Sequence, residues 1–309
     1  MQKQLTDLHL LLEVESPDEV REEVGHLFGL SFPCKVTPLF DRCFDDTIRL
    51  FNGLYKGYQS CRTGYHDLRH TMEVLLATSR MIHATILAGR AIPPHIAELA
   101  LLAALMHDSG YIQRDRYNGT GGQYTLVHVE RSADFFETYG KSIGLNKEDR
   151  QRCCCMIMAT SLALNPDTIS YPDEDTKLAA KLVASADLLG QLAYRIYLEK
   201  LLLLYQEFRE AGVMSFANEF DLLTQTCSFY KMVRKRLDEN LGKLDRSLLL
   251  HFRERWDIDR DLYRESIALN LQYLDRLAGE HRKDYRDRLK RGGIVERIKL
   301  VEAAAKGSV

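Results

Sequence analysis

Apolar residues recur every three or four positions along almost the whole chain, which is the spacing of one face of an α-helix. Two of the clearest examples are HDLRHTMEVLLATSRMIHATILAG at residues 66–89 and HIAELALLAALMHDSG at residues 95–110. Only seven prolines interrupt the 309 residues, and most of them stand between helical stretches. No segment shows a convincing alternation of apolar and polar residues, the pattern of a half-buried strand. We therefore predict an all-α protein.

The predicted helices group into one main domain with additions at both ends. SPDEVREEVGHLFGL predicts an N-terminal helical segment within residues 1–35, with Ser16 as the N-cap and Pro17 at the first helical position. Residues 36–235 hold the core, and residues 236–309 supply helices that complete or flank it. Because the C-terminal helices are amphipathic, they also offer a face for a homodimer.

Composition and charge narrow the classes of function. The net charge is −2, so the chain lacks the basic footprint of a nucleic-acid binder. The longest apolar run, Leu99–Met106, is far short of the roughly 20 residues that cross a bilayer. The seven cysteines include the row Cys153–Cys155 but no CxxC pair, which suits reduced thiols in the cytosol. We expect a cytoplasmic protein that binds neither nucleic acid nor membranes.

Imidazoles and carboxylates interrupt the apolar faces of three predicted helices. His66 and His70 stand four apart, so a helix would place them on one face, one turn above the other. His107 and Asp108 come at the end of an apolar helix, and Asp187 lies within the apolar stretch LVASADLLGQL. Such groups are costly to bury unless each finds a partner.

A divalent cation would satisfy these groups together. Two nitrogens and two oxygens are available from three helices, on His70, His107, Asp108 and Asp187. Mixed ligands of this kind suit borderline first-row metals and leave positions open for water and substrate. We expect one or two ions of Mn, Mg, Zn, Fe, Co or Ni. Taken singly, His66 has a simpler interpretation as a helix cap and Asp187 as the partner of an arginine; the order and spacing of the whole set favour a metal.

The order of these residues resembles that of the HD superfamily of metal-dependent phosphohydrolases, named for its His-Asp doublet. Within the superfamily the pattern is most similar to the 3′,5′-cyclic nucleotide phosphodiesterases. Their His-Asn-x-x-His motif, led by Tyr or Phe, is matched by YHDLRH at residues 65–70. Their His-Asp motif is matched by LLAALMHDSG at residues 101–110, and their last metal aspartate by ASADLLGQ at residues 184–191. The resemblance implies an HD-domain helical bundle and covers roughly residues 40–235.

Two further motifs of that family are matched more loosely. TLVHVERSA at residues 125–133 is similar to a Glu-Asn-His-His helix, and MIMATSL at residues 156–162 keeps the Ala-Thr of an Ala-Thr-Asp motif. The chain also departs from the family at several positions. Where the family has a second histidine after the doublet this chain has Tyr111, the last Asp of Ala-Thr-Asp is Ser161, and the Asn of the first motif is Asp67. The family's purine-gripping Gln shortly before a Phe is matched only by Gln225 and Phe229, one residue too far apart.

The resemblance and the residue types together imply a reaction. A metal ion activates water for attack on phosphorus, and His66, one helical turn from His70, gives a proton to the leaving oxygen. Asp67 or Glu130 is expected to hold the His66 imidazole in its charged form. Asp108 is the candidate to bridge two ions. Around a second ion, or behind the first ligands, we expect His128, Glu130, Asp67 and Thr160.

Our first hypothesis is a metal-dependent phosphohydrolase that cleaves a phosphoester, with a diester favoured, of a nucleotide-like small molecule. Nucleoside mono- or triphosphates are the alternative substrates. A second hypothesis is a non-catalytic signalling or scaffold protein that kept the fold, motivated by Tyr111 and Ser161; the retention of His66 with all four metal ligands favours the enzyme. The loop Tyr111–Thr125, with three glycines, either covers the substrate or is a plain surface connection.

Overall fold

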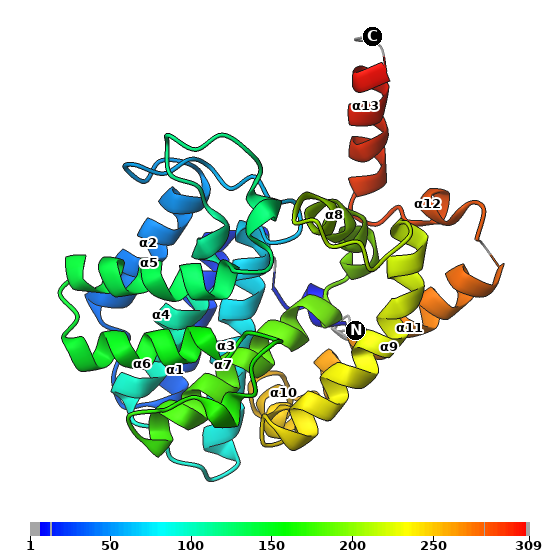
Figure 1. Cartoon of the computed structure of the whole chain (residues 1–309). Helices are drawn as coiled ribbons and strands as arrows, with labels where there is room; N and C mark the ends of the chain where they lie inside the picture. Colours follow the sequence, from blue (N-terminus) through cyan, green and yellow to red (C-terminus); the bar gives the residue numbers. More distant parts are fainter. Residues whose placement is uncertain (1–6, 13, 281, 307–309) are drawn as a thin grey trace.

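The fold is all-α, as the helical spacing predicts. The computed structural model describes residues 7–12, 14–280 and 282–306, and within these ranges it contains thirteen α-helices and no β-strand (Figure 1). The helices are α1 Pro17–Ser31, α2 Pro38–Phe51, α3 Leu68–Leu87, α4 Pro94–Met106, α5 His128–Ser142, α6 Lys147–Met158, α7 Glu174–Ala193, α8 Tyr197–Glu210, α9 Glu219–Glu239, α10 Leu248–Trp256, α11 Leu262–Glu280, α12 Tyr285–Arg288 and α13 Ile294–Lys306.

Helix α3 forms the axis of the molecule. Sixteen of its twenty residues are buried, so it is enclosed on nearly every side. It packs most extensively against α7, and α1, α4 and α10 cover its other faces. Helices α5 and α6 lie side by side on one flank of this arrangement, and α6 also contacts α4 and α7 (Figure 1). The YHDLRH motif therefore lies at the start of a helix that is almost completely enclosed.

The helix ends are set by local bonds between side chains and the backbone. The predicted start of α1 is confirmed, with Pro17 at the first helical position and the Ser16 hydroxyl accepting from the Glu19 N–H. The predicted end of the apolar helix at Gly110 is wrong, because α4 ends at Met106 and a short 3₁₀ helix, Ser109–Tyr111, follows. The Ser109 hydroxyl donates to the Met106 carbonyl at 2.8 Å, which satisfies an acceptor that a longer helix would have used.

The C-terminal helices lie beside and beyond the core. Helices α9 and α11 run along one side of the molecule, and α13 projects from the body near α8 (Figure 1). Ile294, Val295 and Ile298 anchor the start of α13, while Leu300 and Val301 are exposed. The division into segments 1–35, 36–235 and 236–309 stays a prediction, and residues 1–6 and 13 of the first segment lie outside the described residues. Among the described helices, none has both the length and the apolar character needed to span a bilayer.

Candidate metal centre

Three of the four predicted ligands converge on one point between α3, α4 and α7. The Nε2 atoms of His70 and His107 and a carboxylate oxygen of Asp187 all lie within 4.8 Å of one another. Asp187 Oδ1 is 3.3 Å from His70 Nε2 and 3.8 Å from His107 Nε2, and the two nitrogens are 3.4 Å apart. Residues 117 positions apart in the chain thus present their ligand atoms to a common centre, since α3 and α7 pack directly against each other.

The fourth predicted ligand, Asp108, approaches the same two imidazoles. Its Oδ2 lies 3.4 Å from His70 Nε2 and 3.2 Å from His107 Nε2. This oxygen is buried and has no hydrogen-bond partner with good geometry among the described residues. A buried carboxylate oxygen without a donor normally indicates a missing cation or water.

The backbone aims these side chains. His107 Nδ1 lies 2.8 Å from the Ala104 carbonyl oxygen, which can only accept, so Nδ1 carries a hydrogen and donates. In the neutral ring this leaves the Nε2 lone pair pointing into the cluster, the arrangement in which metal-bound histidines are usually held. His70 is the third residue of α3, and its N–H donates to Asp67 Oδ1 at 2.9 Å. Asp67 thereby fixes the first turn that carries His70.

The electrostatics of the cluster fit a divalent cation. Burial disfavours the charged form of His107, but the Asp108 and Asp187 carboxylates outweigh it and raise the pKa of His107 to about 9. Burial opposes ionisation of Asp108 too, yet the surrounding imidazoles hold the pKa of its carboxyl well below the usual range. The cluster therefore binds positive charge strongly. Two nitrogens and two carboxylates are a donor set for a borderline first-row ion, so the residues present fit such an ion.

His66 lies beside the cluster and outside the helix. The prediction that His66 and His70 share a helical face is wrong, because α3 begins at Leu68 with Asp67 as its N-cap. The two rings are nevertheless close, with centroids 5.8 Å apart. His66 is positioned instead by Glu207 of α8, whose Oε2 is 2.6 Å from His66 Nδ1.

Glu207 also controls the charge of His66. Burial disfavours the imidazolium form, but Glu207, with smaller contributions from Asp108 and Asp187, outweighs it and raises the pKa of His66. The other carboxylate oxygen of Glu207 accepts from the Tyr65 N–H at 2.6 Å, which fixes the glutamate in turn. An imidazole whose protonated form is favoured by Glu207 thus lies next to the candidate metal ligands.

The two carboxylates predicted to support His66 have other places. Asp67 caps α3 and receives the Lys200 ammonium at 3.0 Å. Glu130 is exposed on the first turn of α5. The prediction of Asp67 or Glu130 as the partner of His66 is therefore wrong, and Glu207, which no motif marked, takes that place.

Tyr111 and His128, the residue expected near a second ion, lie together on one side of the cluster. The Tyr111 ring stacks on His66 and on His128, with centroids 4.4 and 4.5 Å away. His128 Nδ1 donates to the Thr125 carbonyl at 2.7 Å, and its Nε2 is 3.7 Å from Asp108 Oδ1. His128 thus faces the cluster as expected, and its ring lies close to that of His66, with centroids 5.7 Å apart.

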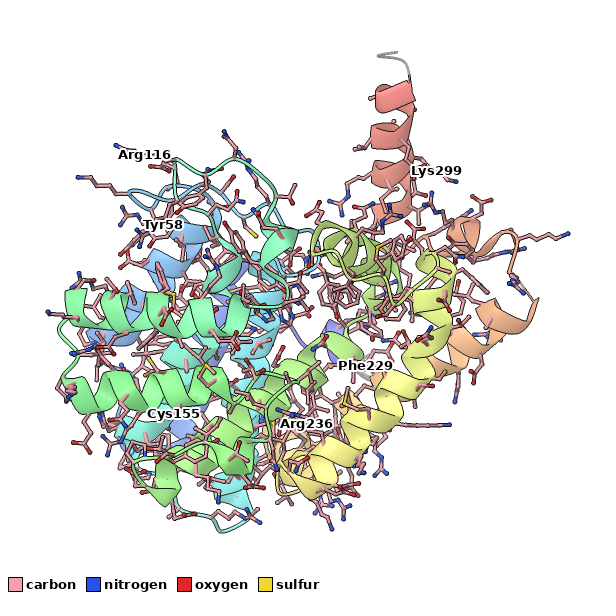
Figure 2. The ribbon with its side chains drawn as sticks, viewed as in Figure 1. Tyr58, Arg116, Cys155, Phe229, Arg236 and Lys299 are labelled. Atoms are coloured by element: carbon pink, nitrogen blue, oxygen red, sulfur yellow. The ribbon has the colours of Figure 1, made fainter. Side chains whose placement is uncertain are left out.

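The Thr160 side chain forms a hydrogen bond with the backbone. Its hydroxyl donates to the Ile157 carbonyl at 2.8 Å, just after α6 ends. The following loop is held by Arg236 of α9, which donates to the carbonyl oxygens of Ser161 and Leu164, each at 2.8 Å (Figure 2). Arg236 of α9 therefore fixes the segment that contains Ser161.

The candidate base-binding pair on α9 is arranged for other contacts. Gln225 is exposed and donates to Asp221 Oδ1 at 3.0 Å on its own helix. Phe229, labelled in Figure 2, is partly buried against the hydrophobic core. This placement gives no support to a purine-binding role for the two residues.

The glycine-rich loop before α5 rests on α8. Gly121–Tyr124 form a 3₁₀ turn, and Gly122 is buried. A Cβ atom at position 122 would lie 2.9 Å from the Glu207 Cα and still nearer to the Glu210 carboxylate, so only glycine permits this contact. The loop is thereby fixed to the same turn of α8 that supports His66.

One protein family matches the part of the chain that contains some of these site residues. Residues 114–251, a little under half of the chain, match a family model described as Npun_R2479-like. That stretch includes His128, Asp187 and Glu207 and leaves out His66 and the His107-Asp108 doublet. No curated protein matches the sequence. The chain is thus similar to the Npun_R2479-like family from Arg114 to His251.

Proposed function

We propose that this protein is a metal-dependent phosphohydrolase of the HD type that cleaves a phosphoester of a nucleotide-like small molecule, with a diester favoured. One observation carries the proposal. A set of histidines and aspartates that fits a divalent ion adjoins His66, an imidazole whose Nδ1 lies 2.6 Å from the buried Glu207 carboxylate. A protein that needed only a helical scaffold would have no use for this combination of buried charges.

His66 is placed to act as a general acid. Glu207 engages Nδ1, so Nε2 is the nitrogen left to give a proton to the leaving oxygen. Glu207 raises the pKa of His66, so it favours the protonated form of the ring that an acid requires. As the bond between phosphorus and the leaving oxygen breaks, the proton from Nε2 converts the departing alkoxide into an alcohol.

The ligand set defines where the ion would sit. It would be held by His70, His107, Asp108 and Asp187. When bound, such an ion supplies positive charge to the phosphoryl group and lowers the pKa of a water molecule towards neutrality. A general acid is most valuable when the leaving group is a poor one, such as the sugar alkoxide of a nucleotide diester. A diester is therefore favoured over nucleoside triphosphates, which have a better leaving group.

A variant of His66 tests these roles. We expect His66→Gln to keep its metal ion, because His66 stands outside the ligand set. On a substrate with an alkoxide leaving group, turnover should fall by about 10²–10⁴-fold, the usual contribution of a general acid. On bis-p-nitrophenyl phosphate the fall should be much smaller, because nitrophenolate leaves without a proton. Turnover is measured on cyclic nucleotides, nucleoside mono- and triphosphates and the nitrophenyl diester with each candidate metal.

The control is His95→Gln. His95 pairs with Asp149 at 2.8 Å and its side chain is more than half exposed, so its loss removes an imidazole without touching the cluster. Loss of metal from His66→Gln would show that His66 is a ligand and that its proposed role is wrong. Equal losses of turnover on both kinds of leaving group would exclude it as the acid.

A non-catalytic role is the second candidate, and Tyr111 is the observation in its favour. The tyrosine ring stacks on both His66 and His128, where it takes up space beside the cluster. If the protein is a scaffold, metal-loaded protein will hydrolyse none of the phosphoesters in the panel. Turnover that disappears in Asp187→Ala together with the bound metal would support the enzyme instead.

A further inference from the structure

A cavity lined in part by α3 and α7 has none of the candidate metal ligands in its wall. Its volume is about 630 Å³, within the range of about 300–1,000 Å³ that is usual for small-molecule sites. Its walls come from residues 8–10, 12 and 14, from α3 and α7, from Tyr263 of α11 and from the turn at Arg291. On α3 the lining residues include Glu73 and Arg80, which lie about a quarter turn around the helix from His70.

Arg80 gives this cavity an unused binding group. The residue is only 2% exposed, and its Nη1 donates to the Tyr263 hydroxyl at 3.2 Å. Its Nε and Nη2 have no hydrogen-bond partner among the described residues, and no other described arginine leaves both of these atoms buried and unpartnered. Nε and Nη2 form one edge of the guanidinium, and their two N–H groups point the same way. Such an edge can hold a carboxylate or phosphate through two parallel bonds, but here both atoms have almost no accessible surface, so an anion in the cavity is attracted by the positive charge of Arg80.

The cavity has a surplus of positive charge. Arg69 is neutralised by Glu15 at 3.0 Å, which leaves the guanidinium groups of Arg80, Arg195 and Arg291 along the wall. Glu73 is 6% exposed, and one of its oxygens has no hydrogen-bond partner. Burial raises the pKa of Glu73 well above its ordinary value, and a single carboxyl group does not offset three guanidinium groups in any case. A ligand for this cavity should therefore carry negative charge.

The rest of the wall is largely aliphatic. Leu8 and Leu12 from the N-terminal segment face the cavity together with Leu76 of α3 and Ile196. These side chains favour the burial of an apolar body and offer it no hydrogen bonds. We propose that the cavity binds a small amphipathic anion, with a carboxylate or phosphate head among the guanidinium groups of Arg80, Arg195 and Arg291 and an aliphatic body between the N-terminal segment and α3. The proposal does not depend on the function of the metal centre.

Head-group chemistry provides the first test. Dodecanoate, dodecyl phosphate and dodecanol share one aliphatic body, and each is titrated into the full-length, delipidated protein by calorimetry. We expect at least one of the two anions to bind with one molecule per chain and at least tenfold more tightly than the alcohol. The tighter anion identifies the head as carboxylate or phosphate. Equal binding of dodecanol, or binding of neither anion, would overturn the proposal, and this comparison requires no variant.

A pair of arginine variants locates the site. Arg80→Met keeps the aliphatic stem of the side chain and removes the charged guanidinium group, so the affinity for the anion should fall at least tenfold. Arg90→Met removes an exposed arginine just beyond the end of α3 and should leave the affinity unchanged. Metal content is measured in both variants and should match the wild type. An Arg80→Met protein that still binds the anion with wild-type affinity would exclude this cavity as the site.

Discussion

At the scale of single residues, the site combines groups that the sequence marks with groups that it does not. His70, His107, Asp108 and Asp187 are predictable because each interrupts an apolar helical pattern in a known order. Glu207 is not, although it lies 2.6 Å from His66. Helix α8 carries several glutamates, and periodicity does not tell which of them will face a partner 141 residues away.

Glu73 should make stability depend on pH. The folded protein keeps a proton on Glu73 that the unfolded chain releases above about pH 4.5. Stability from this group is therefore complete below that pH and is lost as the pH rises towards the raised pKa. Glu73→Gln removes the ionisation, so its melting temperature relative to wild type should increase between pH 5 and pH 8. Thermal melts at the two pH values measure the change.

Glu130→Gln serves as the control, because Glu130 is exposed on α5. Its melting temperature should track that of the wild type at both pH values. A constant difference between Glu73→Gln and wild type from pH 5 to pH 8 would show that Glu73 is already ionised in the folded protein.

At the scale of elements, periodicity predicts that helices exist, and local chemistry decides where they end. The predicted helix over residues 95–110 extends past the end of α4 at Met106. A periodic pattern does not show that the Ser109 hydroxyl donates a hydrogen bond to the Met106 carbonyl and so helps to end the helix. The start of α3 differs for the same kind of reason, since Asp67 caps the helix and leaves His66 outside it. Both ends lie at the metal centre, so errors of a few residues there change which face a histidine presents.

Gly110 is where the turn after α4 meets α5. A Cβ atom at this position would come within 2.8 Å of the Ser132 nitrogen and closer still to the His128 carbonyl oxygen. We expect Gly110→Ala to destabilise the protein by about 1–3 kcal/mol, as overpacking does elsewhere. It should also weaken metal binding, because Asp108 stands two positions away. Urea denaturation and metal titration measure the two effects.

Gly25→Ala is the matched control for Gly110→Ala. Gly25 lies inside α1, and an added Cβ would meet nothing within 4 Å. Replacing a helical glycine there should stabilise the protein by roughly 0.5–1 kcal/mol. Similar stability changes for the two variants would mean that the turn at Gly110 yields easily and that its close contact with α5 has no structural weight.

At the scale of the whole molecule, the all-α architecture follows from the sequence pattern, whereas its interior spaces do not. The cavity at Arg80 has walls from the N-terminal segment, α3, α7, α11 and the turn at Arg291. No periodic pattern reports how side chains from five separate stretches leave a gap. The candidate metal centre could be predicted from the sequence, because a few chemically distinctive residues identify it. The cavity could not be predicted, because it is defined only by the packing of the atoms around it.

A bound ion should stabilise the whole fold. Its ligands come from α3, from the turn after α4 and from α7, so the unfolded chain does not assemble them. An ion at 100 times its dissociation constant adds about 2.7 kcal/mol to the free energy of unfolding. Chelation should therefore lower the melting temperature of the wild type and leave that of Asp187→Asn unchanged. An equal response in both proteins would place the stabilising ion at some other site.

The contact of Gly122 with α8 links the surface loop to proton chemistry. A methyl group at this position would press on the main chain that carries the Glu207 carboxylate, because the nearest backbone atom would be only 2.9 Å away. Moving that carboxylate even slightly outward weakens its hold on the imidazole and makes the proton easier to lose. A substitution that adds no charge and makes no contact with the His66 ring would thus lower the pKa of His66 without changing any of the candidate metal ligands.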